Sequence, residues 1–348
     1  MKPDRGKPLR TRLGFIALAV VFVLSGCTAG TAGTSGEPGA GAEKPKPSDQ
    51  IAKALANVTS VHPSTGMTLL EGPVVGPDGD LYFVDVTAPP GAPKVMALDV
   101  DSLEKRTIFT DGTSAVTSAQ FSPRDGRLYL TDYLGTIISM TPEGKDQKVF
   151  HSGPVNGATL HADDISFDRA GNLYVTDAAG AQEPYWKPQG RLIRIDGATA
   201  EPTVLADRLA SPNGVAFTPG FDGLWMSLNT ANQIDYIQLT DDGRGVSTAH
   251  PAIHVSAGMG QIDSLAVDAD GNLYVGFHNR AAIIVFDATG QQTATITIPS
   301  KEGEIMSATN IAIKPGTKDA YVTSSGKGGG WIHTFTALAE GIHQSNGG

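Results

Sequence analysis

The sequence contains a single cysteine, Cys27, among its 348 residues, which excludes an intramolecular disulfide framework. Basic residues are also in deficit, since 26 Lys and Arg stand against 36 Asp and Glu and give a formal net charge of −10. Nucleic acid and anionic lipid headgroups attract basic surfaces, so neither is an expected partner of this acidic chain. Turn-forming residues, by contrast, are abundant, with 42 Gly and 22 Pro.

Long apolar runs are rare as well, and the one that stands out is the twelve-residue stretch 13–24 near the N-terminus. Five basic residues precede it, and Leu24-Ser25-Gly26-Cys27 follows with small residues suited to cleavage. A transmembrane helix needs about 20 apolar residues, so residues 1–26 are predicted to be a signal peptide instead. The cleavage region resembles the lipobox of bacterial lipoproteins, which implies that Cys27 becomes the lipidated first residue. A plain signal peptide with an incidental cysteine is the alternative.

Residues 27–49 are mostly Gly, Ala, Thr, Ser, Pro and Lys, and they predict a flexible tether that begins at the lipidated cysteine. Loss of residues 1–26 removes five basic residues and one acidic residue and changes the formal charge to −14, so the lipid is the only expected link to a membrane. We therefore expect an exported protein that is lipid-anchored to the outer face of the bacterial cell membrane. Residues 50–348 form the remaining domain, which we expect to be monomeric.

Helical periodicity is lacking beyond the N-terminus, and a six-fold repeat takes its place. A turn rich in Gly, Asp, Asn or Pro precedes each anchor dipeptide of the repeat, and a short apolar strand precedes each turn. This pattern predicts an all-β fold, a six-bladed β-propeller with four-stranded blades around a central channel. The anchors follow one another at spacings of 47, 45, 51, 49 and 47 residues: Leu81-Tyr82, Leu128-Tyr129, Leu173-Tyr174, Leu224-Trp225, Leu273-Tyr274 and Ala320-Tyr321.

Acidic or amide side chains recur at one position of this repeat, at the start of the first strand of a blade. Glu71, Asp163 and Asp263 each lie ten residues before the anchor leucine. Asn213 lies eleven residues before Leu224, because its turn is one residue longer. Equivalent positions of a propeller converge on its axis, so we expect these four side chains to meet there.

This polar ring has two interpretations. Its residues could cap strand ends around a water-filled channel. Ser118 of the second blade and Asn310 of the sixth lie at the same position when counted from the anchor dipeptide. Three carboxylates at equivalent positions, however, would repel one another unless a cation lay among them. Hard oxygen donors without Cys or a His cluster favour Ca²⁺ over Zn²⁺. The sequence therefore predicts a calcium site on the axis.

Four short motifs carry a family resemblance, and they occur in order at blade spacing: Glu71-Gly72-Pro73, Asp163-Asp164, Pro212-Asn213-Gly214 and Asp263-Ser264. Together they resemble the motif set of the gluconolactonase / senescence marker protein / luciferin-regenerating enzyme superfamily, and within it the drug-responsive lactonases of bacteria. The resemblance runs from about residue 58 to the C-terminus. It implies a six-bladed propeller with one catalytic calcium ion that hydrolyses lactones or related carboxylic esters.

The resemblance also implies roles for single residues. Asp263 would transfer the proton as well as bind calcium. Asp164 is expected to be a neighbour, because adjacent side chains of an extended strand point to opposite sides. His161 could reach a substrate or could be a loop histidine without a catalytic role. A second, structural calcium is doubtful, because the segment 151–160 that would hold it has no carboxylate. The implied calcium ligands are Glu71, Asp163, Asn213, Asp263 and Ser264.

Two classes of function fit these features. The first is an extracytoplasmic calcium-dependent lactone hydrolase, in which the metal polarises a carbonyl and water attacks it. The second is a non-catalytic, calcium-stabilised propeller lipoprotein that acts as a binding module, because propellers serve both purposes. A strictosidine-synthase-like propeller is a third possibility and would need a catalytic residue of its own. The natural substrate is not specified by the sequence.

Overall fold

The computed structural model describes residues 49–180, 187–301 and 303–343, and the fold is built from them. The signal peptide, Cys27 and the tether predicted above lie outside the described residues. Nearly all regular structure is β-strand, and the helices of the described part are two short 3₁₀ turns, η1 (Asn229–Ala231) and η2 (Gly258–Gly260). Within that part, no helix is both long and apolar enough to cross a membrane.

Four of the sheets are antiparallel and contain four strands each, in chain order from β3 to β18. Their strands are β3 (Leu70–Val75), β4 (Leu81–Asp85), β5 (Pro93–Leu98) and β6 (Lys105–Thr110); β7 (Val116–Phe121), β8 (Leu128–Asp132), β9 (Thr136–Met140) and β10 (Lys148–Ser152); β11 (Ala162–Phe167), β12 (Leu173–Asp177), β13 (Gly190–Ile195) and β14 (Pro202–Leu209); β15 (Pro212–Phe217), β16 (Gly223–Leu228), β17 (Gln233–Leu239) and β18 (Val246–His254).

A fifth sheet of nine strands closes the ring. Strand β2, near the start of the described chain, pairs antiparallel with β25 at its end. A single residue pair, Phe277 with Ala308, joins β20 to β23. The strands of this sheet are β1 (Gln50–Ile51), β2 (Lys53–Thr59), β19 (Ile262–Val267), β20 (Leu273–Phe277), β21 (Ala282–Phe286), β22 (Gln292–Thr297), β23 (Ser307–Ile313), β24 (Asp319–Gly326) and β25 (Gly329–Thr336).

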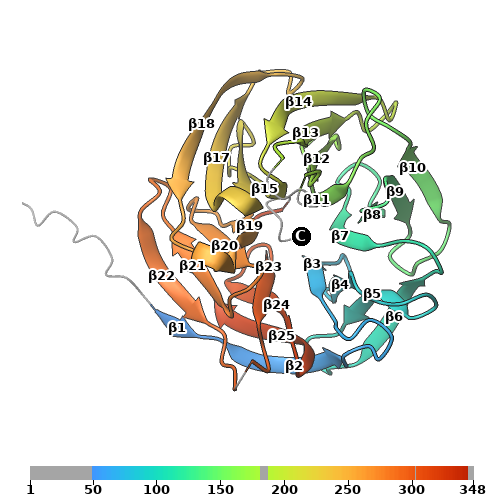
Figure 1. Ribbon diagram of the computed structural model, residues 1–348, viewed down its shortest axis with the longest axis vertical. Helices are drawn as coiled ribbons and strands as arrows, with labels where there is room; N and C mark the ends of the chain where they lie inside the picture. Colours follow the sequence, from blue (N-terminus) through green and yellow to red (C-terminus); the bar gives the residue numbers. More distant parts are fainter. Residues whose placement is uncertain (1–48, 181–186, 302, 344–348) are drawn as a thin grey trace, which may run out of the picture. The chain divides into compact units, whose positions relative to one another are not determined.

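The sheets stand around one axis (Figure 1), and β3, β7, β11, β15, β19 and β23 lie nearest to it. Strands β6, β10, β14, β18 and β22 form the outer rim, with β2 on the same perimeter. The all-β propeller architecture predicted from the repeat is therefore confirmed.

Apolar side chains fill the space between neighbouring sheets, and the anchor tyrosines explain why their dipeptide recurs. Tyr82 packs edge-to-face on Phe121 of the next sheet at a centroid distance of 5.1 Å. The same contact recurs between Tyr129 and Phe167 at 5.2 Å, and between Tyr174 and Phe217 at 5.0 Å. Such a pair adds about 0.5–1.5 kcal/mol beyond the burial of its area. Each of these three anchor tyrosines thus packs its own sheet against the inner strand of the following sheet.

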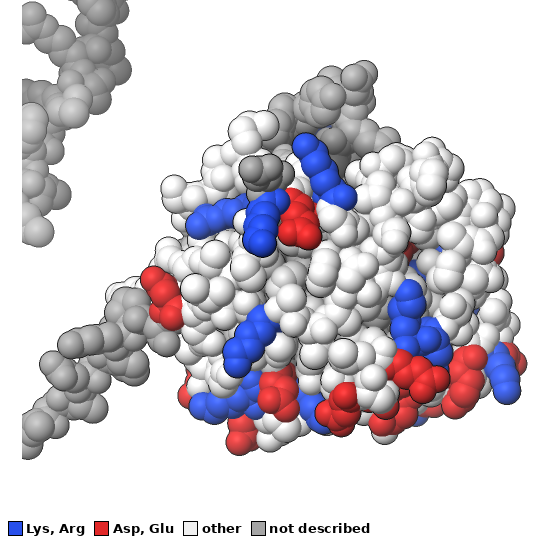
Figure 2. Space-filling model, turned by 90° about the horizontal axis from the view of Figure 1, so that it is seen from below, with Lys and Arg blue, Asp and Glu red and all other residues white. Residues whose placement is uncertain are grey.

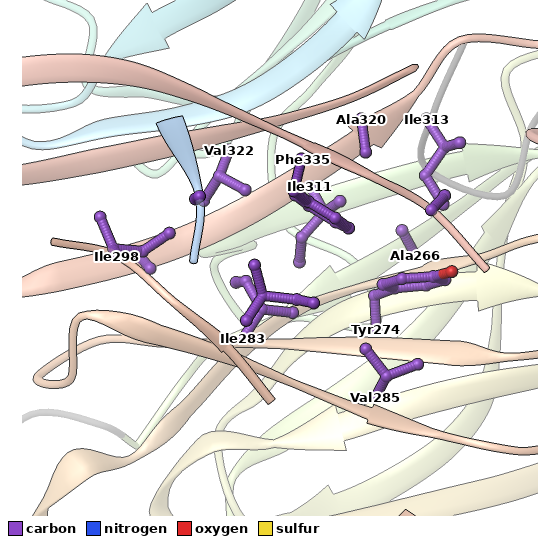
Figure 3. Packing of buried hydrophobic residues seen from close by; sticks show 14 of the residues in the cluster. Ala266, Tyr274, Ile283, Val285, Ile298, Ile311, Ile313, Ala320, Val322 and Phe335 are labelled. Atoms are coloured by element: carbon purple, nitrogen blue, oxygen red, sulfur yellow. The ribbon is translucent and has the colours of Figure 1, made fainter. Parts of the chain in front are cut away.

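Strands β19–β22 and β23–β25 pack against each other in the same way, but their inner strand β23 has no aromatic residue facing Tyr274. Figure 3 shows Tyr274, Ile283 and Val285 of β20 and β21 against side chains of β23–β25. Burying one side chain of this size contributes about 1.5–3 kcal/mol. The facing residues include Ile311, Ile313, Val322 and Phe335.

The C-terminal segment lies at the end of the inner strands where their turns to the second strands occur. The Gly341 N–H donates to Thr317 O at 2.8 Å, and the Ala269 N–H donates to Glu340 O at 2.8 Å. Residues 341–343 also share a cavity with Pro123 and Pro219, which belong to the turns of two other sheets. On the side drawn in Figure 2, charges of both signs are interspersed along the lower edge, and that side presents no continuous basic surface.

Candidate metal centre

A β-bulge interrupts every inner strand near its first residues. A bulge adds one residue to a strand and re-aims its side chains, which is why bulges are common beside functional sites. Here it redirects the side chains at the start of each inner strand, where the polar ring was predicted. The pairing shifts between Glu71 and Val74, Val116 and Ser118, Ala162 and Ile165, Pro212 and Val215, Ile262 and Leu265, and Ala308 and Ile311.

The strand pairing corrects the predicted position of two residues. Phe121 and Phe167 pair with the anchor leucines of their own sheets, and counting back from them places Thr117, not Ser118, at the position of Asp163. The reason is the turn 122–127, which is one residue longer than the turn 168–172. The same extra residue in the turn 314–319 places Thr309, not Asn310, at this position in the last repeat. Ser118 and Asn310 instead take the next position, that of Asp164.

Three of the predicted ligands line one pocket of about 380 Å³. Glu71, Asp163 and Asn213 reach it from β3, β11 and β15, which lie in three different sheets. Asn213 Nδ2 donates to Asp163 Oδ2 at 3.0 Å. Further lining residues come from β7, η1 and the loops: Val86, Ala115, Thr117, Tyr133, Ala178, Ser211, Asn229, Thr230, Gln261 and His278.

Asp263 joins this group from β19. One carboxylate oxygen each of Glu71 and Asp263 and one ring nitrogen of His278 lie within 4.8 Å of one another. Asp163 is not part of that tight cluster and is paired with Asn213 instead. The structure thus brings Glu71, Asp163, Asn213 and Asp263 to one end of the axis.

Asp164 and Ser264 form a second, deeper pair. Asp164 is only 2% exposed, and the Ser264 hydroxyl donates to its carboxylate. Neither residue lines the pocket that contains Asp163. Ser264, predicted as a ligand, is therefore engaged by Asp164 one layer below the pocket.

Hydroxyl groups on the second strands hold the backbone of the site. The Thr131 hydroxyl donates to the carbonyl of Asp163 at 2.7 Å in the next sheet. Ser227 does the same for the carbonyl of Asp263 at 2.6 Å, and it accepts from the Gly214 N–H of its own bulge at 2.7 Å. Thr176 likewise donates to the carbonyl of Asn213. Each of these hydroxyls fixes the main chain of a predicted ligand on the neighbouring sheet.

Aspartates that end the second strands provide another support, which the sequence interpretation missed. Asp177 Oδ1 accepts from the His161 N–H at 2.9 Å, two residues before Asp163. Asp132 accepts in the same way from the Ala115 N–H at 2.8 Å. Asp85 accepts from the Leu69 N–H at 3.3 Å, two residues before Glu71. The sequence signal was an aspartate four residues after the anchor leucine in the first three repeats.

The carboxyl groups of the site have raised pKa values. Burial raises the pKa of Glu71 well above its usual value, and the Asp263 and Asp163 carboxylates raise it further. Burial and the adjacent Asp164 also raise the pKa of Asp163, against the opposing hydrogen bond from Asn213. The pKa of Asp164 rises to about 7, chiefly because of burial.

These residues fit a divalent cation. Asp263 is 1% exposed, and its Oδ2 is buried without a hydrogen-bond partner. Carboxylate and amide oxygens are the donors that hard cations prefer. A cation would offset both the burial and the mutual repulsion that raise these pKa values. The oxygen donors and the Asp263 Oδ2 atom without a hydrogen-bond partner therefore both indicate a cation site.

The two histidines near the site behave differently. His161 Nδ1 lies 3.2 Å from the carbonyl of Tyr133, and the His161 ring packs against the Tyr133 ring. His278 lines the pocket, and its Nδ1 lies 3.4 Å from Asp263 Oδ2. His278 could not be selected from the sequence, because no motif surrounds it and its place follows from the pairing of β19 with β20.

Comparison with known proteins finds relatives in sequence and in structure. Lactonase drp35 of Staphylococcus haemolyticus is 29% identical over 288 residues, which cover 79% of this chain and 85% of that protein. The calcium-binding protein regucalcin of Agrobacterium tumefaciens superposes with a TM-score of 0.67 at 15% identity, covering 85% of this chain and 98% of its own. A gluconolactonase of Xanthomonas campestris superposes with a TM-score of 0.64 at 19% identity, covering 84% and 99%. At these identities the two structures establish the fold alone.

The family assignment comes from the sequence profile of the SMP-30/Gluconolactonase/LRE-like region, which matches residues 69–326. The matched segment contains Glu71, Asp163, Asn213 and Asp263 and most of the propeller. The resemblance inferred from the four motifs is therefore confirmed, and the chain belongs to the SMP-30/gluconolactonase/LRE-like family.

Proposed function

We propose that this protein is a lactone hydrolase that works at a divalent cation, for which the oxygen donors favour calcium. The observation that carries the proposal is the convergence of Glu71, Asp163, Asn213 and Asp263 from four inner strands, where one buried carboxylate oxygen has no hydrogen-bond partner. The relatives named lactonase and gluconolactonase support the reaction class. The relative described as calcium-binding supports the choice of ion.

The proposal includes a six-bladed propeller. The four four-stranded sheets count as four blades. The nine-stranded sheet divides into two more at the single pair between Phe277 and Ala308. Strands β19–β22, with β1 added at the edge of β22, lie on one side, and β23–β25 with β2 lie on the other. Each of the six blades then contributes one bulged inner strand to the axis.

The side chains divide the chemistry between them. Glu71, Asp163, Asn213 and Asp263 would hold the ion, which when bound supplies Lewis acidity toward the lactone carbonyl. Ser264 would stay hydrogen-bonded to Asp164 below them. In this proposal Asp263, whose buried Oδ2 has no hydrogen-bond partner, accepts a proton from an attacking water. A cavity of about 380 Å³ falls within the usual range for small-molecule sites.

The loops around the pocket orient the substrate in this proposal. Val86, Ala115 and Tyr133 offer apolar surface to the lactone ring. Thr230 and Gln261 offer polar groups for the ring oxygen and its substituents. Residues on separate loops can vary independently, so these positions set which lactone is accepted.

The experiment that tests the proposal is hydrolysis of a panel of small lactones, including dihydrocoumarin, with calcium and with EDTA. We expect turnover that EDTA abolishes and calcium restores, and no turnover by Glu71→Ala. Absence of turnover together with tight calcium binding would replace the enzyme with a calcium-stabilised binding module.

Asp263→Asn separates chemistry from metal binding in the same assay. The amide keeps the size and one oxygen donor but cannot accept a proton, so we expect kcat to fall about 10²–10⁴-fold while the melting temperature stays close to that of the parent. Near-normal kcat in this variant would refute the proton-transfer role.

We also propose that the protein works outside the cytoplasm. The basic segment, the apolar stretch 13–24 and Cys27 support export and lipidation. In this proposal the lipid holds a monomer at the outer face of the membrane, and the substrate is a small molecule that reaches the pocket from solvent.

A further inference from the structure

We propose that His278 is a nitrogen ligand of the metal centre and that it shifts the preference of the centre from Ca²⁺ toward Mn²⁺ and Zn²⁺. The inference rests on the metal centre of the proposed function and deepens it. It concerns which ion is bound, and it does not depend on the reaction that follows.

The position of His278 is fixed by the strand pair that carries Asp263. Phe277, the last residue of β20, pairs with Ile262, which directly precedes Asp263 in β19. The His278 N–H then donates to the Gln261 carbonyl at 2.9 Å, which extends the pairing by one residue. The imidazole therefore starts from backbone that is held in register with the backbone of Asp263.

The distances suit a shared ion. A ring nitrogen of His278 and carboxylate oxygens of Glu71 and Asp263 lie within 4.8 Å of one another. Two ligands that are each about 2.0–2.2 Å from one metal lie at most about 4.4 Å apart, so small side-chain movements suffice to bring all three to one ion. Asp263 Oδ2, the atom 3.4 Å from His278 Nδ1, is also the buried oxygen without a hydrogen-bond partner.

His278 differs from His62 and His161 in its exposure to the pocket and in the length of its polar contact. His62 Nε2 lies 2.7 Å from Asp85 Oδ2, and His161 Nδ1 lies 3.2 Å from the Tyr133 carbonyl. The His278 side chain is 43% exposed and faces the pocket, so an ion can reach it from solvent.

A nitrogen donor changes the preference of the site. Ca²⁺ takes oxygen ligands almost exclusively, whereas imidazole suits Zn²⁺ and other first-row divalent ions. Two carboxylates and one imidazole form a mixed set that an all-oxygen interpretation of Glu71, Asp163, Asn213 and Asp263 did not include. The competing explanation is an ion pair in which a protonated His278 neutralises Asp263.

The two explanations predict opposite effects of removing the imidazole. A ligand role predicts that His278→Ala weakens Mn²⁺ and Zn²⁺ binding by about tenfold or more and changes Ca²⁺ binding little, because only the first-row ions use the nitrogen. An ion-pair role predicts that the variant binds all three ions equally well or more tightly, because a competing positive charge is removed.

The experiment is calorimetric titration of the metal-free full-length protein with Mn²⁺, Zn²⁺ and Ca²⁺ in the parent, His278→Ala and His161→Ala. His161→Ala is the matched control, since it removes a histidine beside the same pocket that is already hydrogen-bonded. We expect selective loss of Mn²⁺ and Zn²⁺ affinity in His278→Ala alone. Equal changes for the three ions, or none, would overturn the inference.

A spectroscopic measurement on the parent protein alone also tests whether a His278 nitrogen binds the metal. Electron spin echo modulation of the Mn²⁺-loaded parent should show coupling to an imidazole nitrogen, and its absence would also overturn the inference. Both measurements are made without substrate. A protein that binds Mn²⁺ through His278 but hydrolyses no lactone would refute only the proposed reaction, and a lactonase with no Mn²⁺–nitrogen coupling would refute only the role of His278.

Discussion

Glu71, Asp163, Asp164 and Asp263 lie close enough together for neighbouring carboxylates to raise the proton affinity of Glu71, Asp163 and Asp164. Burial is the first cause for Glu71, Asp163 and Asp164, and the nearby carboxylates add to it for all three. Such a group binds its proton more tightly in the folded than in the unfolded state. Its contribution to stability is therefore fully present at pH values below the unfolded pKa and is lost as the pH rises through the folded pKa.

This sign gives a prediction for the metal-free protein. Its melting temperature should fall between about pH 4, the ordinary carboxyl pKa, and pH 8, past the pKa of about 7 at Asp164. A bound divalent cation competes with these protons, so the rise in melting temperature on adding metal should be larger at pH 8 than at pH 5. Thermal unfolding at both pH values, with EDTA and with metal, provides the measurement.

Glu71→Gln supplies the control for this prediction. The amide removes one buried carboxyl while keeping its size, so the dependence of the melting temperature on pH should become shallower and the stabilisation by metal smaller. A metal-free protein whose melting temperature rises from pH 5 to pH 8 would contradict the argument.

At the scale of single elements, the sequence predicted the strands well, because the same pattern of apolar strand, tight turn and anchor dipeptide occurs six times. The anchor Leu-Tyr dipeptides and the turns before them located β4, β8, β12, β16, β20 and β24 and so the inner strands before them. The register of Ser118 and Asn310 was wrong by one, because counting from the anchor assumes equal turn lengths. The bulges also could not be predicted. A bulge is defined by the pairing of two strands, and no particular residue type in one strand marks it.

His278 shows a second limit of reading one element at a time. It follows β20, and its partner Asp263 lies on β19, fifteen residues earlier. Only the pairing of the two strands and the approach of Glu71 from β3 give the histidine neighbours that suggest a role. A contact made by three separate elements has no local sequence pattern.

The hydroxyls of the second strands lead to a prediction at this scale. Ser227 accepts from the Gly214 N–H and donates to the carbonyl of Asp263, so Ser227→Ala leaves two buried backbone groups unpaired. The expected loss of stability is about 1–3 kcal/mol, and metal affinity should fall severalfold because the backbone of Asp263 is no longer held. Unfolding and metal titration of the same preparation measure the two effects.

Ser247→Ala is the matched control, because its hydroxyl donates to the carbonyl of Leu239 at 3.0 Å in the same sheet but on the outer strand β18. It should lose some stability and keep full metal affinity. Ser227→Thr, which retains the hydroxyl, should restore binding. If both alanine variants weaken metal binding equally, Ser227 has only a structural role.

At the scale of the whole molecule, the ring has two unlike ends. At one end the bulged starts of the inner strands carry the carboxylates and the pocket. At the other, the C-terminal segment hydrogen-bonds to turns near Thr317 and Ala269 and lies beside turns of two further sheets. Because this segment takes up the turn end, we infer that a small substrate approaches from the pocket end, where the loops that include Tyr133 and Gln261 lie.

The proposed location gives the last prediction. If Cys27 carries the lipid, the parent protein should fractionate with membranes, incorporate labelled fatty acid and leave the membrane only with detergent. Cys27→Ser should be exported without the lipid and recovered in the soluble extracytoplasmic fraction, because a chain with a formal charge of −14 is not attracted to anionic headgroups. Its lactone hydrolysis should equal that of the parent, since the substitution lies outside the propeller strands that carry Glu71, Asp163, Asn213 and Asp263. A serine variant that stays with the membrane would show that another segment anchors the protein, and a parent protein found in the cytoplasm would refute export itself.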